Sequence, residues 1–309
     1  MKAAAFSAYG GPEVLKIMDL ETPKPGPGEV LVEVRAASVN PVDWKMRQGM
    51  LKDFFPVSFP RILGRDMAGV VAGLGEGVTG FKPGDRVYAM NDAKRQGTLS
   101  EFMTIAPALL RLMPKNVDFV GAAALPLAFM TAWISLVKVG ELKRGERILI
   151  HAAAGGVGSL AVQIAKHLGA TVVATCSARN IDYVKGLGAD QVIDYRATDF
   201  AEAVRDLDVV YETVGGKTYE RSFKTLRPGG RLVWIRAEPP QGEALRSDVA
   251  VKLAVINPDA DLLDVARELV ERGALKPQAE SVLPLAEAAK ALQLSQAGHA
   301  RGKIVVTMR

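Results

Sequence analysis

The stretch IHAAAGGVGSLAVQIAKHLGA, from Ile150 to Ala170, decides how a large part of this chain folds. A short apolar run precedes three closely spaced glycines, and an amphipathic pattern follows them. In that pattern Leu160, Ile164 and Leu168 recur at the four-residue spacing of one helix face. The stretch therefore predicts a buried strand, a tight turn and a helix that ends at Gly169.

The turn fits Ala153-x-Gly155-x-x-Gly158, a dinucleotide-binding pattern whose first glycine is replaced by alanine. Gly155 and Gly156 lack the Cβ atoms that would keep the backbone away from a pyrophosphate, and Gly158 lets the helix approach the strand. Amide groups at the helix start would face the anion. The alternative is a purely structural turn. Because strand, turn and helix are all present, we favour a dinucleotide site at Gly155, Gly156 and Val157.

Composition and charge narrow the class of protein. The chain has 309 residues, of which 49% are hydrophobic and 24% charged, and its formal net charge is +5. Because the basic residues are dispersed, we expect no nucleic-acid partner. We expect neither a membrane span nor a signal peptide, since no apolar run is long enough and Gly10, Gly11 and Pro12 interrupt the N-terminal patch. The single cysteine, Cys176, cannot form an intrachain disulfide and fits a cytoplasmic location.

The pattern of the chain changes near Val120. Before it, short β-branched runs are separated by Gly and Pro, and Val30, Val32 and Val34 show the two-residue spacing of a half-buried strand. After it, strand-like and helix-like runs alternate, which is typical of a parallel sheet with helices on both faces. The sequence therefore predicts an α/β protein with a β-rich domain and a doubly wound parallel-sheet domain.

The length of the chain favours two domains. We predict a first domain of residues 1–122 and 275–309, and a second domain of residues 123–274. The last strand-like run, Gly302–Met308, is expected to join the sheet of the first domain.

The residues after the second strand of the α/β region bear on the choice of cofactor. An NAD site has an Asp or Glu about 20 residues beyond the glycines, which binds the ribose hydroxyls. The stretch Ala174–Asn180 has no acid, whereas Ser177 can donate a hydrogen bond and Arg179 offers a planar fork to a phosphate. Tyr195, which ends the third strand, either reaches the same phosphate or covers the sheet. These residues favour NADP(H), the alternative being that Arg179 is a solvated surface residue.

Motifs along nearly the whole chain resemble one protein family. They are GEVLVEVRAASVNPVDW, PRILGRDMAGVVAGLGEGVTGFKPGDRV, GTLSEF, PLAFMTAW, AAAGGVGSLAVQIAKHLGA, GADQVIDYR, VYETVGG, LRPGGRLV and RGKIVV. The sequence resembles the zinc-independent branch of the medium-chain dehydrogenase/reductase superfamily, the quinone oxidoreductases and alkenal/enone reductases. The resemblance implies a GroES-like β-barrel catalytic domain, a Rossmann NADP-binding domain and a homodimer. Residues 236–255 show no family motif, and we expect them to shape the pocket or a dimer edge.

The resemblance also implies that the chain binds no metal. Asn40 stands where zinc-dependent members have their first Cys ligand, and Gly64–Asp66 reads Gly-Arg-Asp in place of Gly-His-Glu. Of the three histidines, His151 and His167 fall on the first strand and helix of the expected Rossmann domain and are not clustered with cysteines.

The same resemblance places further residues at the cofactor and the substrate. It places Asn40 by the nicotinamide ribose, where its amide is expected to donate to a developing oxyanion, and Asp43 is expected to orient that loop. The alternative for both is a local Asx turn. The other expected cofactor contacts are Thr131, Val214, Gly215, Ile235, Arg301 and Lys303. Thr131 could instead be an ordinary helix threonine, and Arg301 and Lys303 solvated charges at a sheet edge.

Reduction of a quinone, or of the activated C=C bond of an enone or enal, fits such a site. Without zinc an alcohol has no easy route to the alkoxide. The cofactor supplies the hydride, and the protein positions the reactants and stabilises the resulting anion. Since Trp44 stands where several relatives have a Tyr, we expect solvent to deliver the proton. The alternatives are an enoyl-thioester reductase and an NADPH-binding module without turnover.

Overall fold

A computed structural model describes residues 1–235 and 246–308. The chain divides into two compact units, the first Met1–Leu127 with Pro258–Arg309 and the second Ala128–Asn257. Residues 236–245, part of the segment expected to shape a pocket or dimer edge, lie outside the described residues.

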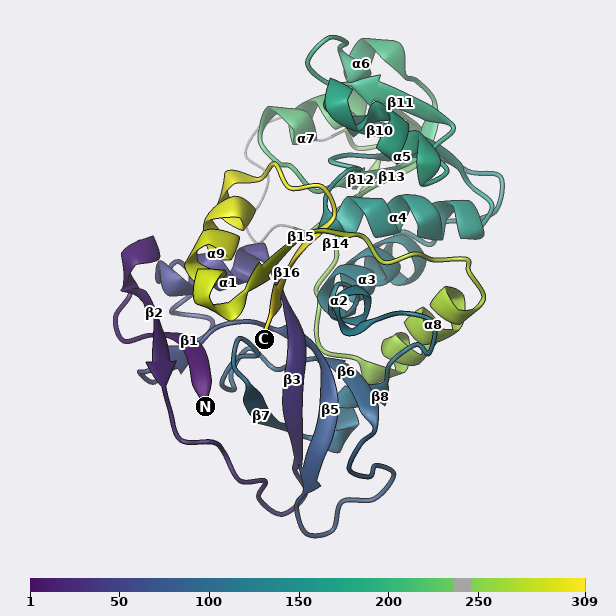
Figure 1. The fold of residues 1–309 in the computed structure, drawn as a ribbon. Coiled ribbons are helices and arrows are strands. Elements are labelled where there is room, and N and C mark those ends of the chain that lie inside the picture. Colours follow the sequence, from purple (N-terminus) through teal and green to yellow (C-terminus); the bar gives the residue numbers. More distant parts are fainter. Residues whose placement is uncertain (236–245, 309) are drawn as a thin grey trace. The chain divides into compact units, whose positions relative to one another are not determined.

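The first unit is built mainly on antiparallel strands, and β15 and β16 are its parallel pair among the described strands (Figure 1). Its strands are β1 (Lys2–Phe6), β2 (Leu15–Asp19), β3 (Val30–Val39), β4 (Arg61–Ile62), β5 (Asp66–Leu74), β6 (Arg86–Met90), β7 (Phe102–Ile105), β8 (Leu110–Leu112), β15 (Ala279–Pro284) and β16 (Lys303–Thr307). Its helices are α1 (Pro41–Arg47), α2 (Phe119–Ala123), α8 (Ala260–Glu271) and α9 (Ala288–Ala297), with 3₁₀ turns at Pro12–Val14, Pro107–Leu109 and Leu285–Glu287. The described strands form a seven-stranded sheet, ordered β15-β16-β3-β5-β6-β8 with β7 also paired to β3, and a small sheet β2-β1-β4.

Strand β3 organises the core of the first unit. Val30, Val32 and Val34 are buried, and the residues between them are half-buried, so the predicted two-residue spacing is confirmed. Strand β16 pairs antiparallel with β3 in the register Ile304↔Val39, which confirms that the C-terminal strand joins this sheet. This register brings residue 303 beside residue 40, although they are far apart in the sequence.

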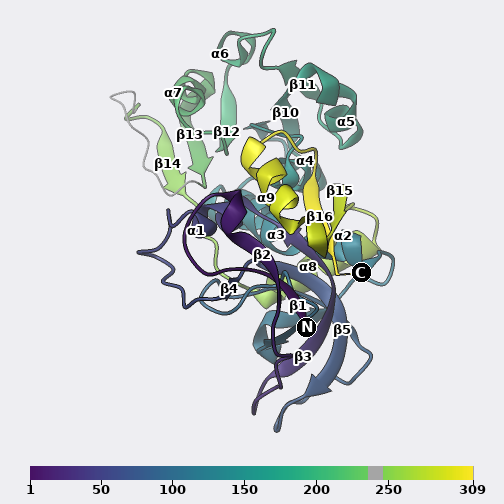
Figure 2. The same ribbon diagram turned by 60° about the vertical axis from the view of Figure 1, so that its left-hand side comes forward.

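The second unit contains a parallel sheet. Its strands are β9 (Arg147–Ile150), β10 (Thr171–Cys176), β11 (Gln191–Asp194), β12 (Leu207–Glu212), β13 (Leu226–Trp234) and β14 (Ala250–Leu253). Its helices are α4 (Gly156–His167), α5 (Ile181–Gly186), α6 (Phe200–Ala203) and α7 (Lys217–Ser222), with a π-helix at Ile134–Val139 and 3₁₀ turns at Ala178–Asn180 and Phe223–Thr225; α3 (Pro126–Trp133) spans the border between the units. The sheet order is β11-β10-β9-β12-β13-β14, with every neighbouring pair parallel (Figure 2).

This sheet confirms the predicted doubly wound α/β domain. The strands β9, β10 and β12 are buried along nearly their whole length, as expected where helices cover both faces of a sheet. Strand β9 leads through a turn into α4, and Gly169 at φ +84° ends that helix, as the sequence predicts. Among the described residues, no helix combines the length and apolar character needed to cross a bilayer.

The structure moves the predicted second domain boundary from residue 275 to residue 258. Residues 258–274 form α8 and its flanks, which pack on the first unit. The Tyr88 hydroxyl on β6 donates to the Leu263 carbonyl, and the Arg111 guanidinium on β8 contacts Asp264 at 2.7 Å. An amphipathic helix can cover either domain, so its pattern alone did not reveal which sheet it joins.

Candidate active site and nucleotide-binding turn

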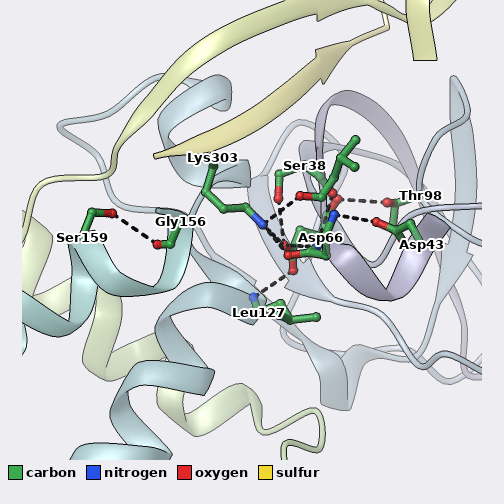
Figure 3. A network of polar contacts seen from close by, with 10 residues as sticks. Ser38, Asp43, Asp66, Thr98, Leu127, Gly156, Ser159 and Lys303 are labelled. Atoms are coloured by element: carbon green, nitrogen blue, oxygen red, sulfur yellow. Dashed lines mark hydrogen bonds and ion pairs between the residues drawn. The ribbon is translucent and has the colours of Figure 1, made fainter. Parts of the chain in front are cut away.

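A buried polar cluster surrounds Asp66 in the first unit. Asp66 begins β5 and is fully buried. Its Oδ2 accepts hydrogen bonds from Ser38 Oγ at 2.8 Å and Asn40 Nδ2 at 2.9 Å, and its Oδ1 accepts from the Leu127 amide at 2.8 Å. Figure 3 shows Ser38, Leu127 and Lys303 directed toward this carboxylate. The burial of a carboxylate is tolerated here because both oxygens have donors.

Lys303 supplies a positive charge to the cluster. Its side chain, at the start of β16, is 6% exposed, and its Nζ lies 3.5 Å from Asp66 Oδ2. The ammonium also donates to the Val39 carbonyl at 3.1 Å and to Asn40 Oδ1. Burial lowers the pKa of Lys303, and the charge of Asp66 acts in the opposite direction. The sequence left open whether Lys303 is a solvated charge at a sheet edge. In the structure Lys303 forms a buried ion pair with Asp66.

The Asn40 amide is held on both sides. A lysine ammonium can only donate and an ionised carboxylate can only accept, so the atom facing Lys303 is Oδ1 and the atom facing Asp66 is Nδ2. The second amide hydrogen lies toward the Ser38 carbonyl, with Nδ2 3.5 Å from it. Donation from this amide to an oxyanion stays a prediction, and it would require hydrogens that Asp66 and Ser38 now engage.

Asp43 lies on the other side of Asn40. Its Oδ2 accepts the Asn40 main-chain N–H at 2.7 Å, and its own N–H donates to the Asn40 carbonyl at 3.0 Å, so the two residues close the start of α1. Burial raises the pKa of Asp43 to about 7, and the nearby charge of Asp66 acts in the same direction. The hydrogen bond from Asn40 and the charges of Lys303 and Arg65 partly offset this rise.

Sequence reasoning missed three members of the cluster, Ser38, Asp66 and Thr98. Thr98 Oγ1 donates to the Asp66 carbonyl at 2.9 Å. Gly64 makes this approach possible: its φ is +99°, and a Cβ there would lie 3.1 Å from the Leu99 nitrogen and even closer to Thr98 Oγ1. The Gly-Arg-Asp triplet at residues 64–66 could have pointed to Asp66, but the triplet entered the prediction only as an argument against zinc.

The glycine turn of the second unit presents the start of α4. The first hydrogen bond of the helix runs from the Ser159 amide to the Gly155 carbonyl at 2.9 Å. The amides of Gly156, Val157 and Gly158 therefore lie ahead of it on the first turn, where helix geometry provides no partner within the helix. The Ser159 hydroxyl donates back to the Gly156 carbonyl at 3.2 Å (Figure 3). Such a turn is suited to a pyrophosphate.

Gly158 is required by close packing. A Cβ at this position would meet the Ala152 carbonyl oxygen and would lie 2.8 Å from the Ala153 Cα. These are backbone atoms and cannot turn away. The helix therefore approaches the end of β9 as closely as the dinucleotide pattern requires.

The residues predicted for the cofactor's 2′-phosphate lie at the carboxyl ends of β10 and β11. Ser177 directly follows β10 and accepts a hydrogen bond from Asn180 Nδ2 at 3.2 Å, and Arg179 is exposed. The Tyr195 amide donates to the Cys176 carbonyl at 3.2 Å, which places Tyr195 at the same sheet edge. Its ring is exposed, and the Arg196 guanidinium lies 5.7 Å from the ring centroid. Arg196 is a cation of this edge that sequence reasoning did not select.

The other predicted contacts have varied surroundings. Thr131 is buried on α3, and Ile235 directly follows β13. The amides of Val214 and Gly215 both donate to the buried Glu212 carboxylate, with distances of 2.9 Å. In the first unit, Arg301 pairs with Glu280 at 3.3 Å. The first unit holds Asn40, Asp43, Arg301 and Lys303; the second holds Thr131, Gly155, Gly156, Val157, Ser177, Arg179, Tyr195, Val214, Gly215 and Ile235.

Two family models match parts of this chain. Residues 26–115 match the family model of the alcohol dehydrogenase GroES-like domain, and residues 187–306 match that of the zinc-binding dehydrogenases. The chain is 36% identical to the chloroplast envelope quinone oxidoreductase homolog of Arabidopsis thaliana, over 99% of this chain and 98% of that protein. It is 37% identical to the NADPH-dependent alkenal/one oxidoreductase of the same plant, over 99% and 79%.

A solved structure extends the similarity to three dimensions. The Escherichia coli quinone oxidoreductase complexed with NADPH superimposes with a TM-score of 0.89 at 29% identity, covering 99% of this chain and 100% of that one. The chain belongs to the medium-chain dehydrogenase/reductase superfamily, in its quinone oxidoreductase and alkenal/enone reductase branch. The predicted family and the predicted GroES-like and Rossmann domains are confirmed. The activity of the branch is that of an NAD(P)H oxidoreductase.

The residues that bear on a possible zinc site make other contacts here. Arg65, in the middle of the Gly-Arg-Asp triplet, donates through Nε and Nη2 to the Asn91 carbonyl at 3.1 and 3.0 Å. His151 is buried in the second unit between Thr175 Oγ1 and Ser222 Oγ, each at 3.0 Å, and burial lowers its pKa to about 3. Within residues 1–235 and 246–308, no three His, Cys, Asp or Glu side chains gather closely enough to hold a metal ion.

Proposed function

We propose that this chain uses NADPH to reduce a quinone or the activated C=C bond of an enone or enal, without zinc. The observation that carries the proposal is the sheet edge of the second unit. There the first-turn amides of α4 follow the glycine turn. Strand β10 ends at Cys176 and is followed by Ser177 and Arg179 instead of by an acid. The names of the relatives support both the cofactor and the two acceptor classes.

The choice of NADPH over NADH rests on charge. Asp194 ends β11 at this edge, and its Oδ1 accepts the Arg196 amide at 3.1 Å. A 2′-phosphate carries negative charge and three acceptor oxygens, which suit the guanidinium of Arg179 and the hydroxyls of Ser177 and Tyr195. NADH lacks this phosphate and would leave those groups unused.

The chain's own residues position the reactants and bind the anions. The nicotinamide cofactor supplies the hydride when bound. The amides of Gly156 and Val157 would hold its pyrophosphate at the helix start. The cluster of Asn40, Asp43 and Lys303 would hold the nicotinamide side in a fixed geometry, because each of these side chains is buried and hydrogen-bonded. The proton that completes the reduction is expected from solvent.

The buried cation of the first unit supports catalysis without zinc. The Lys303 ammonium contacts both Asn40 Oδ1 and the Asp66 carboxylate. A divalent ion bound to the same two side chains would meet this positive charge at close range and would have to displace it. The ligand set is also poor for zinc, since neither residue is a Cys or a His.

A homodimer is part of the proposal. Among the described strands, β14 is the last in the order of the parallel sheet, and its Val251 and Leu253 are exposed. An exposed apolar edge strand can pair with the same strand of a second copy. The molar mass in solution, measured by light scattering, tests this expectation.

Product-resolved kinetics tests the proposed reaction. The purified chain is offered NADPH or NADH with a small enone, an ortho-quinone or a crotonyl thioester. We expect NADPH to support saturated ketone or hydroquinone formation far better than NADH. Turnover of the thioester alone would establish the enoyl-thioester reductase instead. NADPH binding without turnover of any acceptor would establish a binding module.

The variant Arg179→Ala tests the cofactor assignment. Loss of a hydrogen bond to a charged group corresponds to about 10- to 100-fold, so the KM for NADPH should rise by that factor while the KM for NADH stays the same. The matched control is Arg272→Ala, which removes an exposed guanidinium at the residue that follows α8 in the first unit. Equal changes for both cofactors would contradict the role of Arg179.

A further inference from the structure

Three buried side chains of the first unit form a closed arrangement around one amide. Lys303 Nζ donates to Asn40 Oδ1, Asn40 Nδ2 donates to Asp66 Oδ2 at 2.9 Å, and Lys303 Nζ lies 3.5 Å from the same carboxylate oxygen. All three residues are at most 5% exposed. The arrangement depends on the pairing of β16 with β3, since 263 positions separate Lys303 from Asn40 in the sequence.

The chemistry of the two ions leaves the amide one orientation. If the amide turned by 180°, its NH₂ group would face the ammonium and its oxygen would face the carboxylate. Both hydrogen bonds would be lost, and each would become a contact of like polarity inside the protein, where such contacts are most costly. A single ion would bias the orientation, whereas the buried pair determines it from both sides.

The orientation decides what Asn40 can offer to a ligand. Its two amide hydrogens point to Asp66 and to the Ser38 carbonyl, whereas Oδ1 accepts from Lys303 and has a second lone pair. In this orientation Asn40 is an acceptor for a hydroxyl or amide donor. The hydroxyls of a nicotinamide ribose are such donors.

We propose that Lys303, together with Asp66, is a positioning residue that fixes the Asn40 amide as a hydrogen-bond acceptor, and that hydride transfer depends on this fixed orientation. The second part rests on the proposed function, whereas the first concerns the protein alone. Two other charged groups, Asp43 and Arg65, act on the same cluster. Asp43 binds the main chain of Asn40 and not its amide, so it does not select the orientation.

The test needs a variant that folds. Lys303→Met alone would leave the buried Asp66 carboxylate without its counter-ion, which destabilises a fold strongly. The double variant Asp66→Asn/Lys303→Met removes both charges together and keeps similar volumes. Because the Leu127 amide can only donate, it keeps the oxygen of the residue 66 amide, and the NH₂ group then faces Asn40, so the wild-type orientation of Asn40 is no longer favoured. The matched control is Lys290→Met, which removes an exposed lysine from α9 in the same unit.

The first readout is the Asn40 side chain itself, and it needs no activity. The chain has five asparagines, so ¹⁵N-asparagine labelling gives a simple spectrum in which Asn40→Ala identifies the Asn40 signals. In the wild type and in Lys290→Met we expect slow exchange of the Asn40 side-chain hydrogens. In the double variant exchange should be at least about tenfold faster. Unchanged exchange would overturn the positioning role.

The second readout is turnover with NADPH, measured on protein whose circular dichroism and melting curve show that it is folded. We expect kcat of the double variant to fall by about 10- to 100-fold, because small errors in position cost that much. A folded double variant with wild-type kcat would overturn the dependence of hydride transfer on this pair. If the wild type itself reduces no acceptor, the proposed function fails, and the exchange measurement still decides whether Lys303 positions Asn40.

Discussion

The pKa of Asp43 makes the stability of the first unit depend on pH in a direction that can be measured. Burial raises this pKa from 3.8 to about 7. A carboxyl whose pKa is raised by folding stabilises the folded state fully below 3.8, and this stabilisation is lost as the pH rises through 7. At about 1.36 kcal/mol per pKa unit the whole effect is about 4 kcal/mol, of which about 3 kcal/mol falls between pH 5 and pH 8.

The substitution Asp43→Asn isolates this effect. Asparagine keeps an oxygen that can accept the Asn40 N–H, and it carries no charge at any pH. Relative to that of the wild type, the free energy of unfolding of the variant should therefore increase by about 3 kcal/mol between pH 5 and pH 8, which means that the variant gains stability over the wild type.

The assay is urea unfolding at both pH values, followed by tryptophan fluorescence. In a Trp133→Phe/Trp234→Phe background the remaining Trp44 lies on α1 next to Asp43, so the signal reports the first unit. Asp53→Asn, at an exposed position, is the matched control and should show no such change with pH. If the difference between Asp43→Asn and the wild type is the same at pH 5 and pH 8, the carboxyl is ionised throughout and the reasoning is refuted.

Three further substitutions test local packing, each by chemical denaturation. Gly158→Ala places a methyl group against backbone atoms and should lower the free energy of unfolding by about 1–3 kcal/mol. It should also weaken NADPH binding in a fluorescence titration. The control Gly186→Ala, where a Cβ meets nothing, should leave the stability unchanged or raise it slightly. Asp259→Ala removes the N-cap of α8 and should cost about 1 kcal/mol. Tyr88→Phe removes the hydroxyl that donates to the Leu263 carbonyl and should cost about 0.5–1.5 kcal/mol. Unchanged midpoints would contradict the packing described for these three positions.

Local patterns predicted most of the individual elements. The spacing of Val30, Val32 and Val34 identified β3, and the glycines of Ile150–Ala170 identified the turn between β9 and α4. These predictions succeeded because the period of burial along an element is set by the geometry of that element alone. The assignment of residues 258–274 to the second unit was wrong. Helix α8 has an apolar face, but its sequence does not indicate which sheet that face covers.

The polar cluster around Asp66 shows what local sequence patterns did not predict. Asp66 was not predicted as a site residue, because a single acid in Gly-Arg-Asp belongs to no local sequence pattern that indicates burial. Lys303 could not be distinguished from a surface lysine by its neighbours in the sequence. Their burial follows from strand pairing: β16 meets β3 in the register Ile304↔Val39, and β5 meets β3 with Asp66 opposite Ser38.

The two kinds of domain, the glycine turn and the family could be predicted from the amino-acid sequence, because they depend on residue order over short spans and on motifs along the chain. The burial of Lys303, its pairing with Asp66 and the single orientation of the Asn40 amide became visible in the folded chain alone. They could not be predicted because this charge is buried where a distant strand brings its counter-ion. That register is set by the packing of the whole sheet and not by the residues beside the charge.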